Sequence, residues 1–598
     1  MRSLLGLIIL GSFTTPSLAW AQENTLKIVY PPANHQTNTD KIFLLGTAPP
    51  TGQVLINNQP IKRSKSGHFA PSFPLEVGEN RFTVTYDNQQ LQIQVTRVDN
   101  QPKIPQGLAF GENTLTPQVD IYRLPGEEIC FSAMASPAVG IASPNANVSV
   151  RLGEQTVKLS PQLKQISLPS NSAIYIDGKN QPITQIIPGK YQGCTKLGIL
   201  PDGKKPEYQL TLNSETTTQV SSGKIQTLLP AKLPIVEIIA EAGVARTGPS
   251  TTDSRLTPLP QGVRASVTGK EGDWLRLDYG AWIHSQETRM IPGAIPPHSM
   301  IRSIISRELP KTTEIVFPLQ VPVPVTVKQG DKTLTLTLHN TTAQTDTIRL
   351  DDNPLISRLD WQQIAPGKVQ YTFNLKTNQQ WGYNLQYRDT SLVLSLRHPP
   401  VLPRRQTQPL SGVKILLNAG HGGEELGAAG PTGYLAKDLN LVVTKLLRDE
   451  LRRRGATVVM AREDDRDLSL VERQKMIEEN EPAMASPAVD IALTFHYRFL
   501  ADDGDAENTK GVSSYWYHPQ AHSLAVLLQN RLVQNLGRSS FGVYWHNLAL
   551  TRPHSAPSVL LELGFMSNPD DFELAMDVQE QRRLARVLAE GVVEWFKK

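Results

Sequence analysis

The spacing of apolar residues along this 598-residue chain changes near residue 411. Before that point apolar and polar residues alternate, as in residues 333–338 (TLTLTL) and 391–396 (SLVLSL). After it, apolar residues between 439 and 451 recur three and four positions apart, following a short apolar run at 413–417. Alternation predicts strands, and a repeat of about 3.6 residues predicts helices. The chain is therefore expected to be multidomain, with β-rich N-terminal modules followed by a C-terminal α/β domain.

Length and charge limit the classes of function. At roughly 150 residues per domain, the chain is long enough for about four domains. It carries 60 Lys and Arg against 56 Asp and Glu, a net charge of +4, which gives no electrostatic reason to expect a nucleic-acid partner. A hydrophobic content of 39% and a charged content of 19% are typical of globular chains. Coiled coil, collagen and bulk disorder are excluded.

The N-terminus has the pattern of an export signal. Met1 and Arg2 precede an apolar run at 4–10, and Ala19-Trp20-Ala21 supplies a small-x-small cleavage site. We expect a signal peptide over 1–21, export across the inner membrane, and a periplasmic or wall-associated location. No later apolar run reaches 18 residues, so no transmembrane anchor is expected.

The sequence contains two cysteines, Cys130 and Cys194. They could form a disulfide in an oxidising compartment, and they could equally be two small unpaired core residues.

Three β modules and a linker are predicted from short strand-like runs separated by Pro and Gly turns. Residues 22–100, the first module, resemble bacterial immunoglobulin-like modules. Residues 101–235, the second module, continue in the same style with no motif that indicates a function. Residues 296–402, the fourth module, are expected to form another sandwich. The Pro-rich segment 403–410 is expected to be a linker before the domain 411–598.

The third module, residues 236–295, is more specific. Segments such as 244–250 (VARTGPS) and 280–283 (GAWI) make it resemble a bacterial SH3-like barrel. Modules of that type often bind cell-wall peptides. Trp274 and Trp282 are either part of such a binding surface or core residues of the barrel.

Ionisable residues stand where apolar strands of the C-terminal domain end. His421 follows the run 413–417, His496 ends the run 491–495, and Glu562 lies inside the apolar run 559–563. Ligands of α/β sheets bind at the carboxyl ends of strands. A single histidine there is more often structural, but two imidazoles with a buried carboxylate indicate zinc-dependent hydrolysis.

Residues 413–597 resemble the zinc-dependent N-acetylmuramoyl-L-alanine amidase family, which cleaves peptidoglycan. The whole architecture is similar to that of cyanobacterial members. The motifs that carry the resemblance are 418–423 (NAGHGG), 430–433 (GPTG), 437–441 (KDLNL), 462–465 (REDD) and 557–568 (PSVLLELGFMSN).

The resemblance implies a mixed sheet flanked by helices and a zinc-bound water that attacks the amide bond between N-acetylmuramic acid and L-alanine. It makes His421 and His496 zinc ligands and Glu562 the general base that also protonates the leaving nitrogen. Asn440 and Tyr517 are candidate substrate contacts.

Two positions depart from the family pattern. The third ligand of the family is a Glu before the Lys-Asp pair, where this chain has Ala436. The usual Asn two residues after the second ligand histidine is Arg498, which also becomes a candidate substrate contact. An open zinc site normally keeps three protein ligands, so the loss of a carboxylate and the gain of a guanidinium both predict weakened zinc binding. In addition, the segment 483–489 (AMASPAV), an exact repeat of 133–139, precedes the strand of His496.

Other side chains near the motifs are poor replacements for the missing ligand. Asp438 is expected to cap a helix, and Glu424, Glu425 and His554 are not favoured. Two hypotheses follow. The protein is a secreted zinc amidase that acts on peptidoglycan, or it is a catalytically impaired relative that binds peptidoglycan or a cell-wall protein partner.

Overall fold

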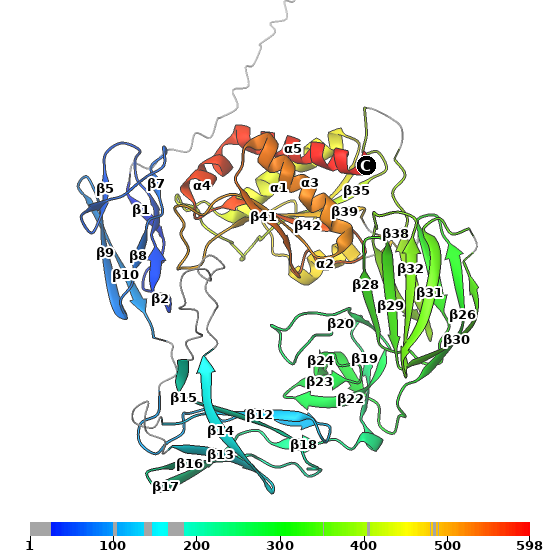
Figure 1. Cartoon of the computed structure of the whole chain (residues 1–598). Helices are drawn as coiled ribbons and strands as arrows, with labels where there is room; N and C mark the ends of the chain where they lie inside the picture. The colour runs from blue at the N-terminus through cyan, green and yellow to red at the C-terminus, as the bar shows by residue number, and fades with distance from the viewer. Residues whose placement is uncertain are drawn as a thin grey trace, which may run out of the picture.

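The structure is a computed structural model. It describes residues 25–99, 104–136, 146–164, 185–350, 352–402, 407–478, 480–481, 486–487 and 489–597. The predicted signal peptide 1–21, part of the predicted linker and part of each AMASPAV segment lie outside the described residues. Figure 1 shows β modules around a C-terminal α/β domain, with the first and fourth modules flanking that domain on two sides. The prediction of a β-rich N-terminal part and a C-terminal α/β domain is confirmed.

Most strands of the first module are short, because turn residues interrupt its apolar runs every few positions, and only the last two are long. The strands are β1 (Lys27–Tyr30), β2 (His35–Thr37), β3 (Lys41–Phe43), β4 (Leu45–Thr47), β5 (Val54–Ile56), β6 (Gln59–Pro60), β7 (His68–Phe69), β8 (Ser72–Pro74), β9 (Gly78–Tyr86) and β10 (Gln89–Arg97). The strand orders are β1-β4-β7, β2-β10-β9-β5-β6 and β3-β8.

The second module is built on one larger sheet. Its strands are β11 (Ile121–Arg123), β12 (Glu128–Met134), β13 (Asn147–Leu152), β14 (Gln155–Lys164), β15 (Gln185–Lys196), β16 (Glu207–Leu212), β17 (Glu215–Val220) and β18 (Ile225–Thr227). The sheet order is β12-β15-β14-β13-β16-β17. Cys130 and Cys194 lie directly opposite each other on β12 and β15 and form a disulfide.

The third and fourth modules follow. The third has the short helices η2 (Pro230–Lys232) and η3 (Ser285–Glu287) and the strands β19 (Ile235–Ile238), β20 (Ala242–Gly243), β21 (Leu259–Pro260), β22 (Arg264–Glu271), β23 (Trp274–Leu277), β24 (Trp282–His284) and β25 (Thr288–Met290). The fourth has β26 (Ser299–Glu308), β27 (Thr312–Phe317), β28 (Val325–Gln329), β29 (Thr333–His339), β30 (Thr341–Arg349), β31 (Ile356–Ala365), β32 (Lys368–Leu375), β33 (Tyr383–Arg388) and β34 (Ser391–Arg397). Its two sheets, β30-β26-β27-β34-β33 and β28-β29-β32-β31, enclose a common core.

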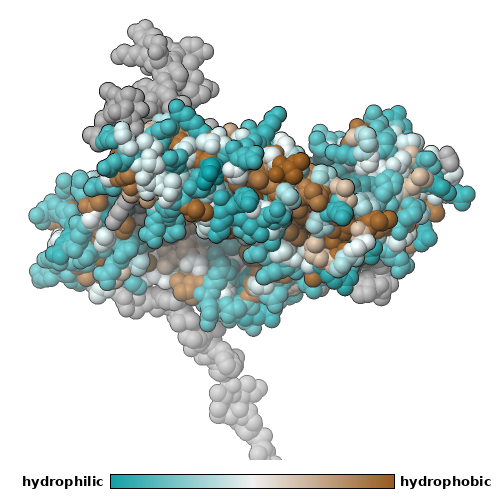
Figure 2. Space-filling model, turned by 90° about the horizontal axis from the view of Figure 1, so that it is seen from below, coloured by the Kyte–Doolittle hydropathy of each residue, from teal (hydrophilic) through white to brown (hydrophobic). Residues whose placement is uncertain are grey.

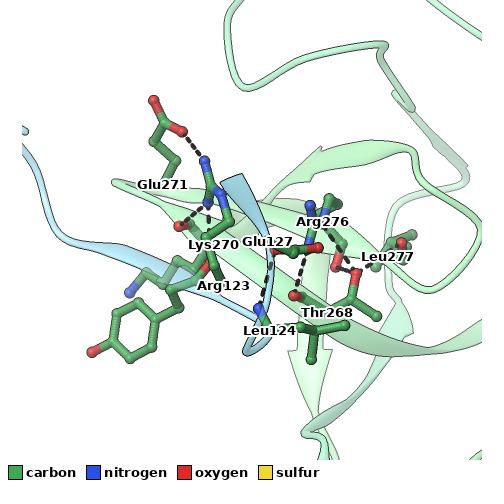
Figure 3. Close-up of polar contacts among 9 residues, drawn as sticks. Arg123, Leu124, Glu127, Thr268, Lys270, Glu271, Arg276 and Leu277 are labelled. Atoms are coloured by element: carbon green, nitrogen blue, oxygen red, sulfur yellow. Dashed lines mark hydrogen bonds and ion pairs between the residues drawn. The ribbon is translucent and has the colours of Figure 1, made fainter. Parts of the chain in front are cut away.

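The second and third modules share a sheet, because β11 pairs with both β18 and β22. Figure 3 shows the polar contacts at this junction: Arg123 pairs with Glu271 (2.6 Å), and Arg276 donates to both carboxylate oxygens of Glu127 (2.6 and 2.8 Å). The guanidinium groups of Arg123 and Arg276 lie 5.3 and 5.9 Å from the ring centroid of Trp282, which is only 7% exposed. Trp282 is therefore buried at a junction between modules.

The C-terminal domain alternates strands and helices. Its elements are β35 (Lys414–Ala419), α1 (Ala436–Arg453), β36 (Thr457–Met460), α2 (Leu470–Glu478), β37 (Asn480–Glu481), β38 (Ser486–Pro487), β39 (Ile491–Arg498), β40 (Val512–Trp516), α3 (Pro519–Leu536), β41 (Ser540–Trp545), β42 (Ser558–Phe565), α4 (Pro569–Met576) and α5 (Val578–Lys597). The main sheet has the order β36-β35-β39-β42-β40-β41 and is mixed, since β40 runs antiparallel to β42.

The two faces of this sheet differ in what covers them. Helices α1 and α3 pack on one face and α5 lies across both, burying the apolar residues of that face in one core. On the other face α2 covers a small second core that includes Leu416 and Ala492. Because side chains alternate along a strand, the residues in phase with Ala492 on β39 point away from the three long helices. The face beyond α2 is where the chemistry-bearing residues lie.

The first and fourth modules are both docked on the C-terminal domain. His35 binds Asp502 (2.8 Å), and the same carboxylate accepts a hydrogen bond from Tyr30. From the fourth module, buried Arg397 donates to the carbonyl of Val489 (2.6 Å) and pairs with Asp490. These contacts lie just before and just after the strand β39 (Ile491–Arg498), so the two modules hold the segments at both of its ends.

Figure 2 shows a face that is mainly hydrophilic, with apolar residues gathered right of its centre. None of the helices in the described part of the chain combines the length and the apolar character needed to cross a membrane.

Candidate active site

Three predicted residues meet on the face of the main sheet that α2 partly covers. His421 follows the end of β35, and His496 lies on β39 in register with Glu562 on the neighbouring strand β42. Register partners on adjacent strands project to the same side of a sheet. The structure therefore brings the two histidines and the glutamate, separated by up to 141 positions in sequence, to one place.

The two imidazoles face each other closely. Their ring centroids are 4.8 Å apart and the rings are inclined by 79°. Gly420 lies against the ring of His496, and a Cβ atom at this position would overlap that ring. His421 itself has a φ of 59°, in the left-handed region that residues other than glycine rarely adopt. The glycine thus allows the close approach, and the unusual backbone of His421 turns its side chain toward His496.

Two buried arginines hold the backbone of this loop. Arg473 on α2 donates to the carbonyls of Ala419 (2.9 Å) and His421 (2.9 Å). Arg462, which is fully buried, donates to the carbonyl of Gly420 (3.1 Å). Hydrogen bonds from a charged donor are stronger than those between neutral groups. The histidine loop is therefore held in place by charged hydrogen bonds from both arginines.

Asn440, predicted as a substrate contact, also serves this loop. It is fully buried on α1, and its Nδ2 donates to the carbonyl of Gly420 (3.1 Å). Its Oδ1 is shielded from solvent and has no hydrogen-bond partner among the described residues.

The charges of the site are set by burial. Burial lowers the pKa of His496 to about 3, and the positive charges of His421, Arg473 and Arg462 act in the same direction. His496 is therefore neutral at neutral pH. Burial raises the pKa of Glu562 to about 7, opposed by the positive charge of Arg498. The Oε2 atom of Glu562 is inaccessible to solvent and makes no hydrogen bond within the described part of the chain.

Ala436 is the first residue of α1 and is fully buried. It lies four positions before Asn440, whose side chain reaches Gly420, and residues four apart share a helix face. Position 436 therefore lies on the side of α1 that faces the histidine loop.

A zinc ion at this site would need a ligand in addition to the two imidazoles. His421 also contacts Glu425, whose Oε1 lies 3.0 Å from Nδ1, but the Glu425 side chain is 64% exposed. No group of three or more His, Cys, Asp or Glu side chains among the described residues could hold a metal ion. Because an open zinc site uses three protein ligands, the two imidazoles alone do not complete one. The residues present do not fit the ordinary zinc centre that the resemblance implies.

Arg498 lies in a pocket of aromatic rings next to Glu562. Its Nη1 donates to the hydroxyl of Tyr515 (2.7 Å), and its guanidinium lies 5.2 Å from the ring centroid of Phe541 and 5.4 Å from that of Phe565. The role of Tyr515 was missed in the sequence, where nothing distinguished it from its aromatic neighbours. Tyr517, a predicted substrate contact, lies farther along and stacks on Trp545 with ring centroids 5.6 Å apart.

Comparison with known proteins finds similarity in the C-terminal domain. Residues 415–594 match the family described as N-acetylmuramoyl-L-alanine amidase, so the predicted resemblance to that family is confirmed for this domain. The chain is 33% identical over 194 residues to the "Probable cell wall amidase LytH" of Staphylococcus aureus. That alignment covers 32% of this chain and 61% of the relative, so the chain spans about three fifths of the length of the curated relatives that it matches.

Solved structures of amidases match the same part of the chain. An N-acetylmuramoyl-L-alanine amidase from Clostridium difficile 630 is 24% identical, with 31% of this chain and 97% of that chain covered and a TM-score of 0.29. The amidase AmiC2 of Nostoc punctiforme is 24% identical, with 31% and 99% covered and a TM-score of 0.29.

Proposed function

We propose that the protein hydrolyses the amide bond between N-acetylmuramic acid and L-alanine in peptidoglycan. The match of residues 415–594 to the amidase family supports this proposal. The observation that carries it is Glu562, a half-buried residue in register with His496, whose Oε2 is shielded from solvent and has no hydrogen-bond partner among the described residues. A catalytic acid–base group is most effective when its pKa lies near the working pH, and the pKa of Glu562 is about 7.

In this mechanism Glu562 moves the protons. Its carboxylate takes a proton from the attacking water and later donates one to the leaving nitrogen of L-alanine. Arg498 opposes protonation of Glu562, and Tyr515 holds the Arg498 guanidinium in place. Arg462, Arg473 and Asn440 are proposed to position the histidine loop rather than to contact the substrate. His421 and His496 are proposed to hold zinc weakly.

A catalytically impaired relative is the second candidate. It is favoured by Ala436 at the position of the missing ligand and by the guanidinium of Arg498 close to Glu562. Such a protein would bind peptidoglycan or a wall protein partner without cleaving a bond.

Digestion of purified peptidoglycan with the full chain tests the main proposal. We expect new amino termini that are L-alanine, with no new reducing sugar ends. Reducing ends without new amino termini would show that a glycosidic bond is cleaved instead and would contradict the proposal.

We further propose that the chain is exported with cleavage after Ala21 and acts in the periplasm or at the wall.

The first and fourth modules are proposed to be immunoglobulin-like and the third SH3-like. This is supported by the small sheets of these segments, which are mainly antiparallel, with β2–β10 and β26–β30 as parallel pairs. Trp274 is only partly buried, so it is the better candidate of the two tryptophans for contact with the wall.

A chain that ends at residue 410 is expected to sediment with insoluble peptidoglycan and to retain most of the bound fraction of the full chain. The reason is that the β modules, the third above all, are proposed to bind the wall. Quantification of the pelleted protein measures this, with the isolated 411–598 segment as the matched control. Pelleting of the 411–598 segment alone would mean that the modules are spacers.

A further inference from the structure

Two arginines of the third module face each other across a β bridge. Arg246 and Arg255 are paired antiparallel. The flanking hydrogen bonds run from the amide of Thr247 to the carbonyl of Ser254 (2.9 Å) and from the amide of Leu256 to that of Ala245 (2.9 Å). This pattern marks a pair without hydrogen bonds between its own members, in which the side chains lie closest. Like charges directly opposite each other destabilise a sheet, so this pair requires an explanation.

A third guanidinium comes from the C-terminal domain. Burial, and then the positive charges of Arg255 and Arg246, lower the pKa of Arg552 to about 10. After burial, the charge of Arg246 also lowers the pKa of Arg255. Three positive groups from two domains are thus close enough to repel one another. We call them the arginine cluster.

The arginine cluster lacks partners for several of its donors. Arg246 Nη1 donates to the carbonyls of Thr251 (2.8 Å) and Asp253 (2.7 Å), but its Nε is shielded from solvent and unpartnered within the described chain. Arg552 Nε donates to Asn547 (2.7 Å), whereas its Nη1 is likewise shielded and has no partner among the described residues. A charged donor that is buried without a hydrogen-bond partner costs free energy. A bound anion would supply the missing partner and recover that free energy.

Two carboxylates offset this charge only in part, because each also binds another group. Glu287 and Glu478 are near enough to raise the pKa values of Arg255 and Arg552, respectively. Both are engaged elsewhere, since Glu287 accepts from the amide of Val244 (2.6 Å) and Glu478 binds His554 (3.1 Å).

The arginine cluster lies one strand length from Glu562. Ser513 of β40 is the register partner of Glu562, and Tyr517, just past the end of β40, is four residues farther along. The next residue, His518, contacts the carbonyl of Arg552 through Nε2 (2.8 Å). Four residues of extended strand span about 13 Å, and Ser513 and Tyr517 are in phase along it. An extended peptide of about four residues covers the same distance. A peptide whose first amide lies at Glu562 can therefore reach the arginine cluster with its far end.

We propose that Arg255 and Arg552, backed by Arg246, bind a carboxylate on the peptide part of the wall polymer. The inference rests on the proposed function, because it takes the scissile amide to lie at Glu562. A guanidinium fits a carboxylate in a planar, two-pronged pair, and two guanidiniums from different domains can grip both oxygens. The third module would thereby contribute directly to substrate recognition by the C-terminal domain.

The test compares two synthetic N-acetylmuramoyl-peptides, one with free carboxylates and one with every carboxylate amidated. Calorimetric titration uses the full chain carrying Glu562→Gln, so that neither probe is consumed. We expect about tenfold tighter binding of the free-carboxylate probe, the usual scale of a charge-assisted contact. Arg255→Gln is expected to abolish that preference. The described structure gives the Arg255 side chain no hydrogen bond or ion pair, so this change should leave the fold intact.

Arg302→Gln is the matched control, because Arg302 is exposed on β26 and its loss changes the net charge equally. The Arg302→Gln variant should keep the preference for the free-carboxylate probe. Equal affinities for the two probes, a preference that survives Arg255→Gln, or no binding of either probe would each overturn the proposal.

A separate hydrolysis assay distinguishes this site from the proposed function. If the chain cleaves both probes with no preference for the free carboxylate, the proposed carboxylate site is wrong and the proposed amidase function stands. If the wild-type chain cleaves neither probe but binding still shows a preference that depends on Arg255, the proposed amidase function is wrong and the carboxylate site stands.

Discussion

Replacing Ala436 with glutamate is expected to raise the zinc affinity of the full chain by at least about 10–100-fold. Loss of groups that only support a zinc ligand typically costs that much, so the supply of a missing ligand should gain no less. Position 436 begins α1 on the side that faces the histidine loop, as the bond of Asn440 to Gly420 shows. A carboxylate there would add a third ligand and a negative charge to two imidazoles that already lie together.

Competition with a chromogenic chelator measures this affinity, and Ala436→Gln is the matched control of similar size without the charge. Because Ala436 is fully buried, the circular dichroism spectra of both variants should be compared with that of the wild type. Tight binding of one zinc by the wild-type chain, unimproved by Ala436→Glu, would show that another residue has replaced the ligand. The proposed weakness of the site would then be wrong.

Glu562→Gln is expected to abolish turnover and at the same time to stabilise the folded protein at alkaline pH. General acid–base catalysis typically contributes about 10²–10⁴-fold, and glutamine cannot accept the proton. The pKa of Glu562 is raised by burial from 4.5 to about 7 in the folded state. The folded protein therefore holds this proton more tightly than the unfolded chain, so wild-type stability falls as the pH rises from about 4.5 through 7.

Glutamine does not titrate, so its advantage over glutamate grows across the same window. We expect a gain of less than about 1 kcal/mol near pH 5 and of roughly 3 kcal/mol above pH 8, which is an upper estimate. Denaturant unfolding at both pH values measures it. Asp503→Asn is the control, because Asp503 is an exposed carboxylate in the same domain. A constant difference between Glu562→Gln and wild type at both pH values would contradict the raised pKa.

Local patterns predicted the individual elements well. The alternating segment 333–338 lies in β29 and 391–396 lies in β34, while the helical repeat between 439 and 451 lies in α1. These patterns succeed because each element buries one face, and burial of one face imposes a period on the sequence. The family resemblance rested on contiguous motifs, and the family match covers the same segment.

Contacts between distant segments could not be predicted in this way. The pairing of β11 with β18 joins segments about 100 residues apart through strands of three residues, which are too short for a periodic signal. The pairing of β11 with β22 places the second and third modules on one sheet, whereas the boundary at 235 remains a prediction. Likewise Arg462 stands in a charged run that is typical of a surface loop, and its full burial follows only from the carbonyl groups around it.

The sequence indicated which residues form the candidate site but not how they are arranged. Strand ends indicated that His421, His496 and Glu562 would lie together. The sequence did not indicate that Arg498 would be held by Tyr515, or that Arg552 would meet the third module, because both depend on how neighbouring strands and domains pack.

The most direct test of the central claim is the release of peptide from an N-acetylmuramoyl-peptide by the full wild-type chain, followed by mass spectrometry with Glu562→Gln as the reference. The proposed function predicts release of a peptide that begins with L-alanine, at a rate at least about 100-fold above that of Glu562→Gln. If the wild-type chain binds the substrate but releases peptide no faster than Glu562→Gln does, the proposed function is contradicted. The second candidate, an impaired relative that only binds peptidoglycan or a wall protein, would then be favoured.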